Sequence, residues 1–324
     1  MAGGQERILR RRIRSVQSTK KITRAMELIA ASRIVKAQAR VHAAVPYSDG
    51  ITEVVKDLAA GGAGKSSPLL QSREEIKRVA QVVFTADRGL CGAYNSSVIR
   101  SAEGEIKTQA EANRDSGLVT IGRKAESHFR YRNFRLDRTW NGFSDSPTYN
   151  QAREIGDDLI TRYMANEFDW VQLVYTRFVS LGFQEIVVRP LIPLDRETIQ
   201  GGDARPNAQE SGRSAEYSFE PSPNAILDSL LPRYVEARVY AALLNAAASE
   251  LAARQRAMKA ATDNAEELIK TLARVMNRAR QDSITTEIME VVGGAEALQG
   301  GATHDSDDET LHVHANYLLT EGAS

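Results

Sequence analysis

The stretch that decides the fold is residues 261–279, which read ATDNAEELIKTLARVMNRA. Small or apolar side chains recur along it in alternating steps of four and three residues. Two helices that wrap around each other bury side chains at this spacing. The residues with this spacing are Ala261, Ala265, Leu268, Leu272, Val275 and Ala279. The pattern therefore predicts a helix with a narrow apolar seam and a partner helix against it.

The predicted helix extends well beyond this stretch. Residues 233–292 contain no glycine and no proline, which permits a helix of about 90 Å. Pro232 stands where the start of a helix tolerates proline, and Gly293 and Gly294 stand where helices usually end. We therefore expect the helix to begin near Pro232 and to end near Gly293.

A second long helix is predicted at the other end of the chain. Residues 5–45 also lack glycine and proline, and Ile22, Met26, Ile29 and Ala30 recur at helical spacing. A rod of about 90 Å is longer than any compact domain that this chain can form. The two helices are therefore expected to pair and to project as a long antiparallel coiled coil.

Between the two helices the sequence predicts a small α/β domain. Short apolar runs alternate with helical patterns, which is typical of a parallel or mixed sheet with a Rossmann-like arrangement. The expected strands are residues 79–84, 117–121, 170–178 and 185–191, and the expected helices are residues 93–112, 123–132 and 149–166. The whole chain then divides into an N-terminal coiled-coil helix (1–58), a central α/β domain with loops (59–216), a C-terminal coiled-coil helix with its lead-in (217–299) and a polar tail predicted to be disordered (300–324).

Composition excludes several classes of protein. One cysteine, Cys91, allows neither an internal disulfide nor a cysteine-rich zinc site. No apolar run approaches the roughly 20 residues that cross a bilayer, and the N-terminus lacks the apolar segment of a signal peptide. We therefore expect no direct membrane insertion, so that any membrane association comes through partner proteins.

Three candidate ligand sites are weak. Residues 59–66 resemble a P-loop, but Ala59 replaces the first glycine and a helix precedes the segment instead of a buried strand. Residues 87–92 lie where α/β proteins often bind phosphates, yet they lack G-x-G-x-x-G, so a tight strand-to-helix turn is the expected role. The tail holds a histidine and acid cluster that a mobile tail explains better than a metal site does. Its histidines are His304, His312 and His314.

The first helix is strongly basic although the chain as a whole is neutral. Eleven lysines and arginines lie between Arg7 and Arg40, with Glu27 as the only acid, whereas the full chain has 42 basic and 42 acidic residues. Such a surface suits either a nucleic-acid backbone or an acidic protein. No aromatic side chain interleaves the basic run, and the same helix needs its apolar stripe for a partner. The pattern therefore favours an acidic protein surface.

The segment 284–297, ITTEIMEVVGGAEA, makes the family recognisable. It matches throughout the signature of F-type ATP synthase gamma subunits, [IV]-T-x-E-x-x-[DE]-x-x-x-G-A-x-[SAKR]. Four further segments resemble the same family: residues 22–32, 87–92, 220–234 and 260–264. The resemblance covers about residues 4–299.

The resemblance implies a non-catalytic subunit with no catalytic residue, cofactor or metal of its own. It implies the central rotor shaft, which couples proton-driven rotation of the membrane c-ring to ATP synthesis, or the reverse, at the beta-subunit catalytic sites. The implied partners are the ring of alpha and beta subunits, the epsilon subunit and the c-ring, and not nucleic acid. The implied location is the cytoplasmic side of the cell membrane, as a peripheral protein. The alternative is a coiled-coil filament protein. The basic first helix and the full signature at residues 284–297 argue against it.

The resemblance also assigns contact residues by position. Lys20, Lys21, Arg24 and Met26 resemble residues that face a mobile acidic loop of the beta subunit. Arg280, Gln281, Thr285 and Glu287 resemble residues that hydrogen-bond another beta-subunit loop. Tyr217, Phe219 and Glu220 resemble the foot of the shaft, which meets the c-ring and epsilon. For each position the structural alternative is an ordinary solvated side chain.

Overall fold

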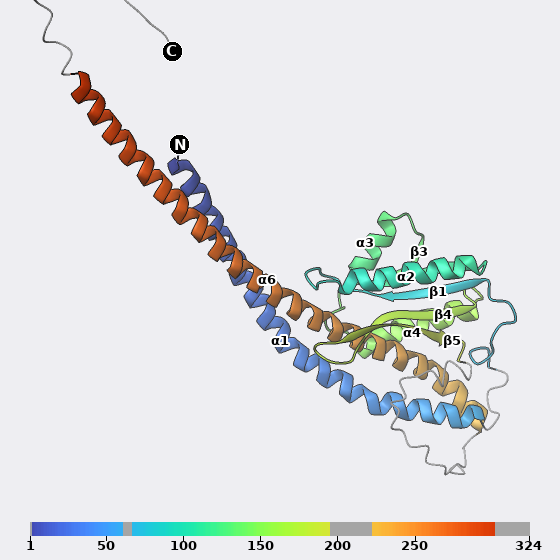
Figure 1. The fold of residues 1–324 in the computed structure, drawn as a ribbon. Coiled ribbons are helices and arrows are strands. Elements are labelled where there is room, and N and C mark those ends of the chain that lie inside the picture. Colours follow the sequence, from blue (N-terminus) through green and yellow to red (C-terminus); the bar gives the residue numbers. More distant parts are fainter. Residues whose placement is uncertain (1, 61–66, 195–221, 302–324) are drawn as a thin grey trace, which may run out of the picture. The chain divides into compact units, whose positions relative to one another are not determined.

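The computed structural model describes residues 2–60, 67–194 and 222–301. The chain divides into two compact units. The smaller consists of Met1–Ser18 and Ala265–Ser324, and the larger is Thr19–Asn264. Two long helices, α1 (Ala2–Ala60) and α6 (Pro223–Gly301), contribute residues to both units (Figure 1).

The larger unit contains a five-stranded sheet with the strand order β3-β2-β1-β4-β5. Strands β1 to β4 are parallel, and β5 is antiparallel to β4. The connections switch direction between β1 and β4, as in the Rossmann-like half that the sequence predicts. The strands are β1 (Arg78–Phe84), β2 (Asp115–Ile121), β3 (Leu136–Trp140), β4 (Trp170–Phe178) and β5 (Gln184–Ile192).

Helices cover both faces of this sheet (Figure 1). On one face α2 (Tyr94–Glu111) and α3 (Arg123–Tyr131) pack over alternate strand residues, with Phe129 fully buried among them. On the other face α4 (Tyr149–Met164) packs beside α1 and α6. Successive side chains along each strand point to opposite faces of the sheet. Each strand therefore contributes side chains to the hydrophobic core on both faces.

Strand β3 is the one element of the sheet that the sequence analysis does not predict. Its residues, LDRTW, are mostly half-buried and have no apolar alternation. Pairing with β2 forms this strand, and Asp137 supports the pairing, since its Oδ2 accepts a hydrogen bond from the Leu118 amide at 3.0 Å. Its Oδ1 also accepts from Arg78 at 2.8 Å. Tertiary contacts, not local propensity, therefore create the strand.

Within the larger unit α1 and α6 run antiparallel. The hydroxyls of Thr23 and Thr262 are 2.8 Å apart and hydrogen-bonded, and both side chains are buried. Further along, Ile34 of α1 packs against Leu251 of α6. Rising residue numbers on α1 therefore meet falling numbers on α6, as the prediction of antiparallel helices requires. The end of α1 adds Ile51, Val55 and Leu58 to the main core.

In the smaller unit the apolar seam of α6 differs partly from the predicted one. Ala265 and Leu272 are buried as expected, but Leu268 is 40% exposed and Val275 is 49% exposed. The partly buried positions are instead Ile269 and Met276, one residue further along. Each exposed residue has an apolar neighbour, so the pattern alone cannot choose between them. The predictions for Leu268 and Val275 were wrong for that reason.

Both predicted ends of the second helix were also wrong. Helix α6 already includes Pro232, although proline removes a backbone hydrogen bond. Leu231 and Tyr234, on either side of it, are almost fully buried, and this packing offsets the loss. Gly293 and Gly294 lie inside the helix as well. A glycine costs a helix about 1 kcal/mol relative to alanine, which weakens it without ending it.

Candidate functional site

The basic residues assigned to the first contact group lie together on α1 in the larger unit. Lys21 and Arg24 are exposed, while Lys20 and Met26 are partly buried. The Arg24 guanidinium donates to both carboxylate oxygens of Glu27 at 2.9 Å. The only acid of the basic run is therefore already paired, and the other charged residues between Arg7 and Arg40 are all basic.

Met26 borders a groove of about 320 Å³ in the larger unit. The apolar part of its lining comes from Met26, Ile29, Ala30, Leu90 and Leu251. Three arginines and a single acid supply the charges. The full lining is Met26, Ile29, Ala30, Arg33, Arg88, Gly89, Leu90, Asp145, Leu251 and Arg254. An apolar side chain flanked by carboxylates would fit this combination of surface and charge.

Leu90 stands out in this groove. Its φ is +64°, a left-handed conformation, and its side chain is 63% exposed. A residue with a side chain loses about 1–2 kcal/mol in this conformation, and exposure returns no packing energy. Such local strain is typical of residues held in place for binding.

The turn that carries Leu90 is anchored by Asp87. The carboxylate accepts hydrogen bonds from the Ser144 amide at 3.0 Å and the Arg123 amide at 3.2 Å. Burial raises the pKa of the Asp87 carboxyl, but backbone hydrogen bonds from Ser144, Gly142 and Arg123 outweigh that effect and hold the pKa below its ordinary value. The segment is a tight connection between β1 and α2, as the sequence predicts.

Two of the three arginines of the groove form ion pairs. Arg33 contacts Asp145 at 2.8 Å, which links α1 to the connection before α4. Arg254 contacts Glu250 at 2.7 Å on α6, and Glu250 is only 2% exposed. Burial raises the pKa of Glu250, whereas Arg254 lowers it. The groove therefore keeps a fixed shape with a positive balance of charge.

The second contact group lies on α6 in the smaller unit, and all four of its residues are exposed. The Thr285 hydroxyl donates to the Gln281 carbonyl at 3.0 Å, and Glu287 accepts from Ser283 at 3.2 Å. Arg280 belongs to the same exposed segment. These bonds within the helix are weak enough for a partner to replace.

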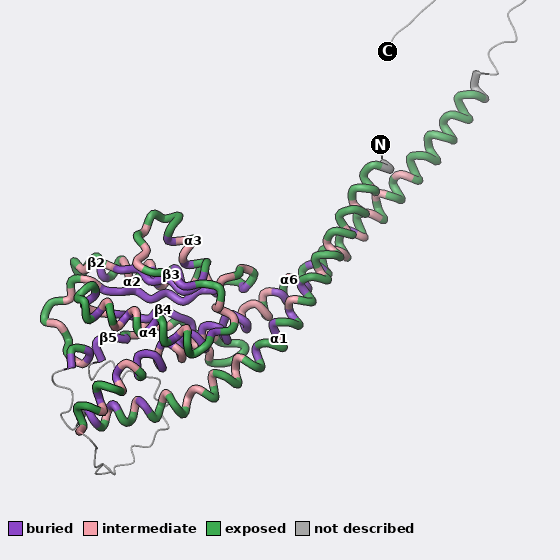
Figure 2. Tube along the Cα trace, turned by 180° about the vertical axis from the view of Figure 1, so that it is seen from behind, coloured by how far each residue is buried: buried purple, intermediate pink, exposed green. Residues whose placement is uncertain are grey.

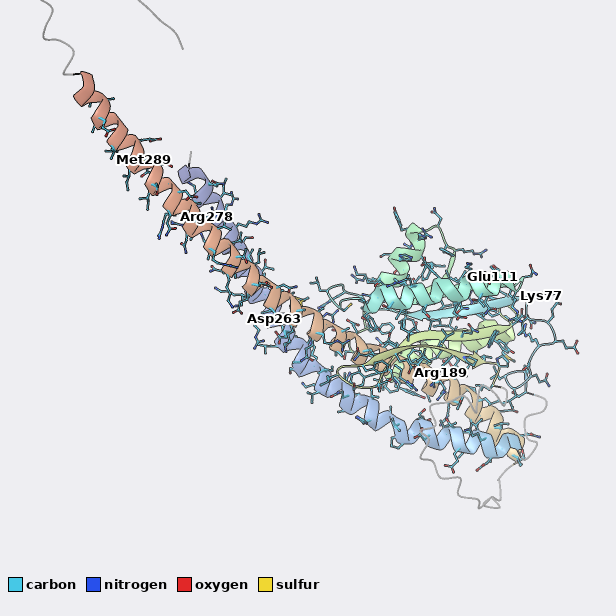
Figure 3. All side chains as sticks on the ribbon, viewed as in Figure 1. Lys77, Glu111, Arg189, Asp263, Arg278 and Met289 are labelled. Atoms are coloured by element: carbon cyan, nitrogen blue, oxygen red, sulfur yellow. The ribbon has the colours of Figure 1, made fainter. Side chains whose placement is uncertain are left out.

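An uncovered apolar surface continues from this group toward the end of α6. Every residue from 284 to 298 is exposed, as the green end of the helix in Figure 2 shows. Ile288 is 56% exposed and Met289 is 69% exposed; Figure 3 shows Met289 projecting from the helix. A run of exposed apolar side chains marks an interaction surface.

Several predicted positions lie outside the described residues: Tyr217, Phe219, Glu220, the P-loop-like residues 61–66 and the tail histidines His304, His312 and His314. In the described parts of the chain, no cluster of three or more His, Cys, Asp or Glu side chains could hold a metal ion. No helix among the described residues combines the length and apolar character needed to cross a membrane.

Cys91 is buried, with 1% of its surface exposed. Burial raises the pKa of its thiol and Glu250 adds to the rise, so the reactive thiolate is disfavoured. The groove residues Arg88, Leu90 and Arg254 were not predicted as contact residues from the sequence. A bulky apolar residue in a polar, glycine-flanked turn was the available signal for Leu90.

Comparisons with known proteins agree on one family. The family model described as ATP synthase matches residues 5–298. The ATP synthase gamma chain of Kineococcus radiotolerans is 50% identical over 300 residues, covering 91% of this chain and 97% of that protein. The gamma chain of a Parafrankia species is 49% identical, covering 92% and 99%.

Solved structures show the same fold. A chain of the Tetrahymena thermophila mitochondrial ATP synthase central stalk and c-ring is 26% identical, with a TM-score of 0.56 over 74% of this chain and 99% of that one. A chain of the Euglena gracilis mitochondrial ATP synthase is 16% identical, with a TM-score of 0.66 over 96% of this chain and 100% of that one. The chain therefore belongs to the family of ATP synthase gamma chains.

Proposed function

We infer that the chain is the central rotor shaft of an F-type ATP synthase. The observation that carries this inference is the family match over residues 5–298, which includes both long helices and the sheet between them. The chain is a non-catalytic subunit in this proposal, and the catalytic sites belong to the beta subunits. Proton-driven rotation of the c-ring turns the shaft during ATP synthesis, and ATP hydrolysis turns it in reverse.

The shaft itself is a coiled coil of α1 and α6 in this proposal. The Thr23–Thr262 hydrogen bond and the Ile34–Leu251 contact support antiparallel pairing in the larger unit. In the smaller unit, partly buried residues of α1 recur in steps of four and three, at Leu9, Ile13 and Val16. The functional parts are then the shaft (1–58 and 217–299), the side domain (59–216) and the tail (300–324).

Coupling requires contacts that differ among the three beta subunits, because only unequal interactions shift a set of conformational states. We assign Lys20, Lys21, Arg24 and Met26 to an acidic beta-subunit loop, since the first three are cations on the same stretch of α1 and Met26 borders a groove with positive charge. We assign a second contact to the exposed polar residues Arg280, Gln281, Thr285 and Glu287, which are free to exchange their helix-internal bonds for a partner's.

The foot of the shaft completes the proposal. Tyr217, Phe219 and Glu220 meet the c-ring and the epsilon subunit by resemblance to the family. The subunit is thereby peripheral to the cell membrane, on its cytoplasmic side, and is attached only through its partners.

Assembly with alpha and beta chains tests the proposed function. We expect the full chain, coexpressed with the alpha and beta chains of its own source, to copurify as one complex. A bead attached to the chain should then rotate when ATP is added. A homopolymer of the chain, or a complex in which the bead never rotates during ATP hydrolysis, would contradict the shaft.

Met26→Lys tests the first beta-subunit contact. The substitution adds a cation to a groove that already contains three arginines, so it changes the fit of the acidic loop. We expect the protons pumped per ATP hydrolysed to fall about twofold or more, because coupling free energies are about 1–3 kcal/mol. Proteoliposomes containing the assembled complex measure both rates. Ala39→Lys, which adds the same charge to an exposed position outside the groove, is the control and should keep the parent ratio.

A further inference from the structure

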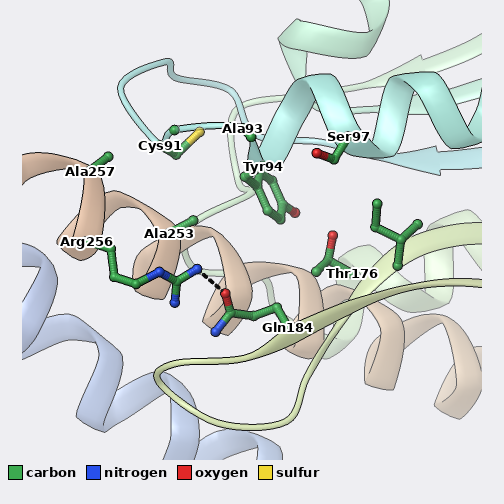
Figure 4. Close-up of a pocket in the computed structure, with 11 residues that line it drawn as sticks. Cys91, Ala93, Tyr94, Ser97, Thr176, Gln184, Ala253, Arg256 and Ala257 are labelled. Atoms are coloured by element: carbon green, nitrogen blue, oxygen red, sulfur yellow. Dashed lines mark hydrogen bonds between the residues drawn. The ribbon is translucent and has the colours of Figure 1, made fainter. Parts of the chain in front are cut away.

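A second cavity in the larger unit, of about 410 Å³, has no role in the shaft proposal. It lies between the start of α2, strand β4 and helix α6, as Figure 4 shows. Its volume is within the range of about 300–1,000 Å³ for small-molecule pockets. The residues that line it are Cys91, Gly92, Ala93, Tyr94, Ser97, Thr176, Gln184, Ile186, Ala253, Arg256 and Ala257.

The position of this cavity in the sheet is informative. The chain leaves β1 for α2 on one face and enters β4 from α4 on the other face, so the connections diverge between these two strands. Thr176 lies near the carboxyl end of β4. In open α/β sheets, ligands bind in the crevice outside the carboxyl ends of the strands at this switch point.

The first turn of α2 faces the cavity without a side-chain cap. Ala93 is the N-cap residue of this 18-residue helix and makes no side-chain cap hydrogen bond; of the first-turn amides, that of Tyr94 donates to the Cys91 carbonyl at 3.3 Å. Helix N-termini offer unpaired amides and a partial positive charge, both of which favour anions. Gly92, with φ +59°, brings backbone rather than a side chain to this edge of the cavity.

A buried hydroxyl provides independent evidence for a ligand. Thr176 is 5% exposed, and its Oγ1 has no hydrogen-bond partner among the described residues. Figure 4 shows this hydroxyl pointing into the cavity beside Tyr94. A buried polar atom left without a hydrogen bond costs about 1–3 kcal/mol. A ligand whose oxygen accepts a hydrogen bond from this hydroxyl would remove that cost.

A cation and a second hydroxyl border the same space. The Arg256 guanidinium is held by the Gln184 side chain and the Leu181 carbonyl, which use only two of its five N–H groups. Burial raises the pKa of the Tyr94 hydroxyl well above its ordinary value, and Glu250 adds to the rise, so this group stays a neutral donor. The buried acid Glu250 is paired with Arg254.

We propose that this cavity is a binding site for a small phosphate-bearing anion, held by the first-turn amides of α2, the Thr176 hydroxyl and the Arg256 guanidinium. The phosphate oxygens accept all of these hydrogen bonds, and the guanidinium balances the charge. The apolar walls formed by Ile186, Ala253 and Ala257 suit a phosphate monoester with an apolar group as well as free phosphate. The site is independent of the rotor role.

Titration of the isotope-labelled full chain tests the site. Inorganic phosphate and phenyl phosphate are added separately at constant ionic strength, and amide resonances are followed by NMR. We expect saturable shifts at Gly92, Ala93 and Tyr94. Tighter binding of phenyl phosphate would identify a monoester as the ligand, whereas equal binding would identify free phosphate, and either result supports the site.

Matched variants separate this site from general attraction of anions. We expect Thr176→Val, which keeps the shape of the side chain, and Arg256→Gln each to weaken binding about tenfold, the effect of losing one hydrogen bond to a charged group. Thr161→Val and Arg153→Gln on α4, across the sheet, should bind like the parent. Ala93→Asp places a carboxylate at the helix start and should abolish binding while the fold is retained.

The proposal is overturned if neither probe gives saturable shifts at residues 92–94. It is also overturned if the site variants, shown to be folded by their unchanged remaining spectra, bind as tightly as the two controls. Failure here would leave the copurification and rotation results unaffected, because the titration needs no partner subunit.

Discussion

Gly122→Ala is expected to destabilise the larger unit by about 4 kcal/mol or more, a loss that few single substitutions reach. Gly122 joins β2 to α3 with φ +94°. A Cβ at this position would lie 2.0 Å from the Thr85 carbonyl oxygen and 2.6 Å from its carbonyl carbon. Neither atom belongs to a flexible side chain, so the backbone itself would have to move.

The backbone around Gly122 has little freedom to relax. The Gly122 amide donates to the Trp140 carbonyl at 2.8 Å, and the Thr85 amide donates to the Ile121 carbonyl at 2.8 Å. The Thr85 hydroxyl accepts from the Ala125 amide at 2.9 Å. A shift of Thr85 away from the new methyl group would break its bonds to Ile121 and Ala125, and a shift of Gly122 would break the bond to Trp140 of β3.

Urea unfolding monitored by tryptophan fluorescence measures this effect, because Trp140 and Trp170 both lie in the sheet of the larger unit. Gly142→Ala is the matched control. Gly142 has the same φ of +94°, but nothing lies within 4 Å of its added Cβ. It should lose only the conformational term of about 1–2 kcal/mol. Equal losses for the two variants would show that the close contact at Thr85 has no effect.

Arg254→Ala is expected to destabilise the larger unit by about 3–5 kcal/mol at neutral pH. The substitution leaves the Glu250 carboxylate, which is 2% exposed, without its cation. It also removes the Arg254 hydrogen bond to the Gly89 carbonyl at 3.3 Å, and with it one anchor of the turn that carries Leu90. The unpaired charge is the larger of the two losses.

The loss of stability caused by Arg254→Ala should depend on pH and should grow as the pH rises. Burial already raises the pKa of Glu250 while Arg254 lowers it, so removing Arg254 raises the pKa further. The folded state then binds a proton at a pH where the unfolded chain does not, and stability therefore falls as pH rises through this window. The loss of unfolding free energy caused by Arg254→Ala should therefore shrink as the pH falls from about neutral toward about 4.5, the ordinary pKa of a glutamate side chain.

Arg153→Ala serves as the control for this pair. Arg153 and Asp157 also form an i,i+4 ion pair, at 3.7 Å, but their side chains are 65% and 56% exposed. Pairs of this kind contribute about 0–1 kcal/mol. Urea unfolding of both variants at several pH values gives the comparison. A cost for Arg254→Ala that is as small as that of the control, or that does not change with pH, would contradict a buried, uncompensated carboxylate.

The amino-acid sequence by itself determined the two long helices, the alternating α/β order between them and the family. These features rest on local periodicity and on contiguous motifs such as residues 284–297, which need no knowledge of neighbours in space. Between the long helices the structure has eight helices and strands, and seven of them match the predicted ranges within a few residues; the eighth, β3, was not predicted.

Tertiary structure alone decided the features that depend on which surfaces meet. The seam of α6 passes through Ile269 and Met276, and not through Leu268 and Val275. Both members of each adjacent pair are apolar, so only the side on which the neighbouring helix lies decides which one is buried. Strand β3 exists because β2 pairs with it. The groove at Met26 and the cavity at Thr176 each combine residues far apart in the sequence. Periodicity reports a residue's own helix or strand, whereas a site is defined by the approach of several elements, and only packing fixes that approach.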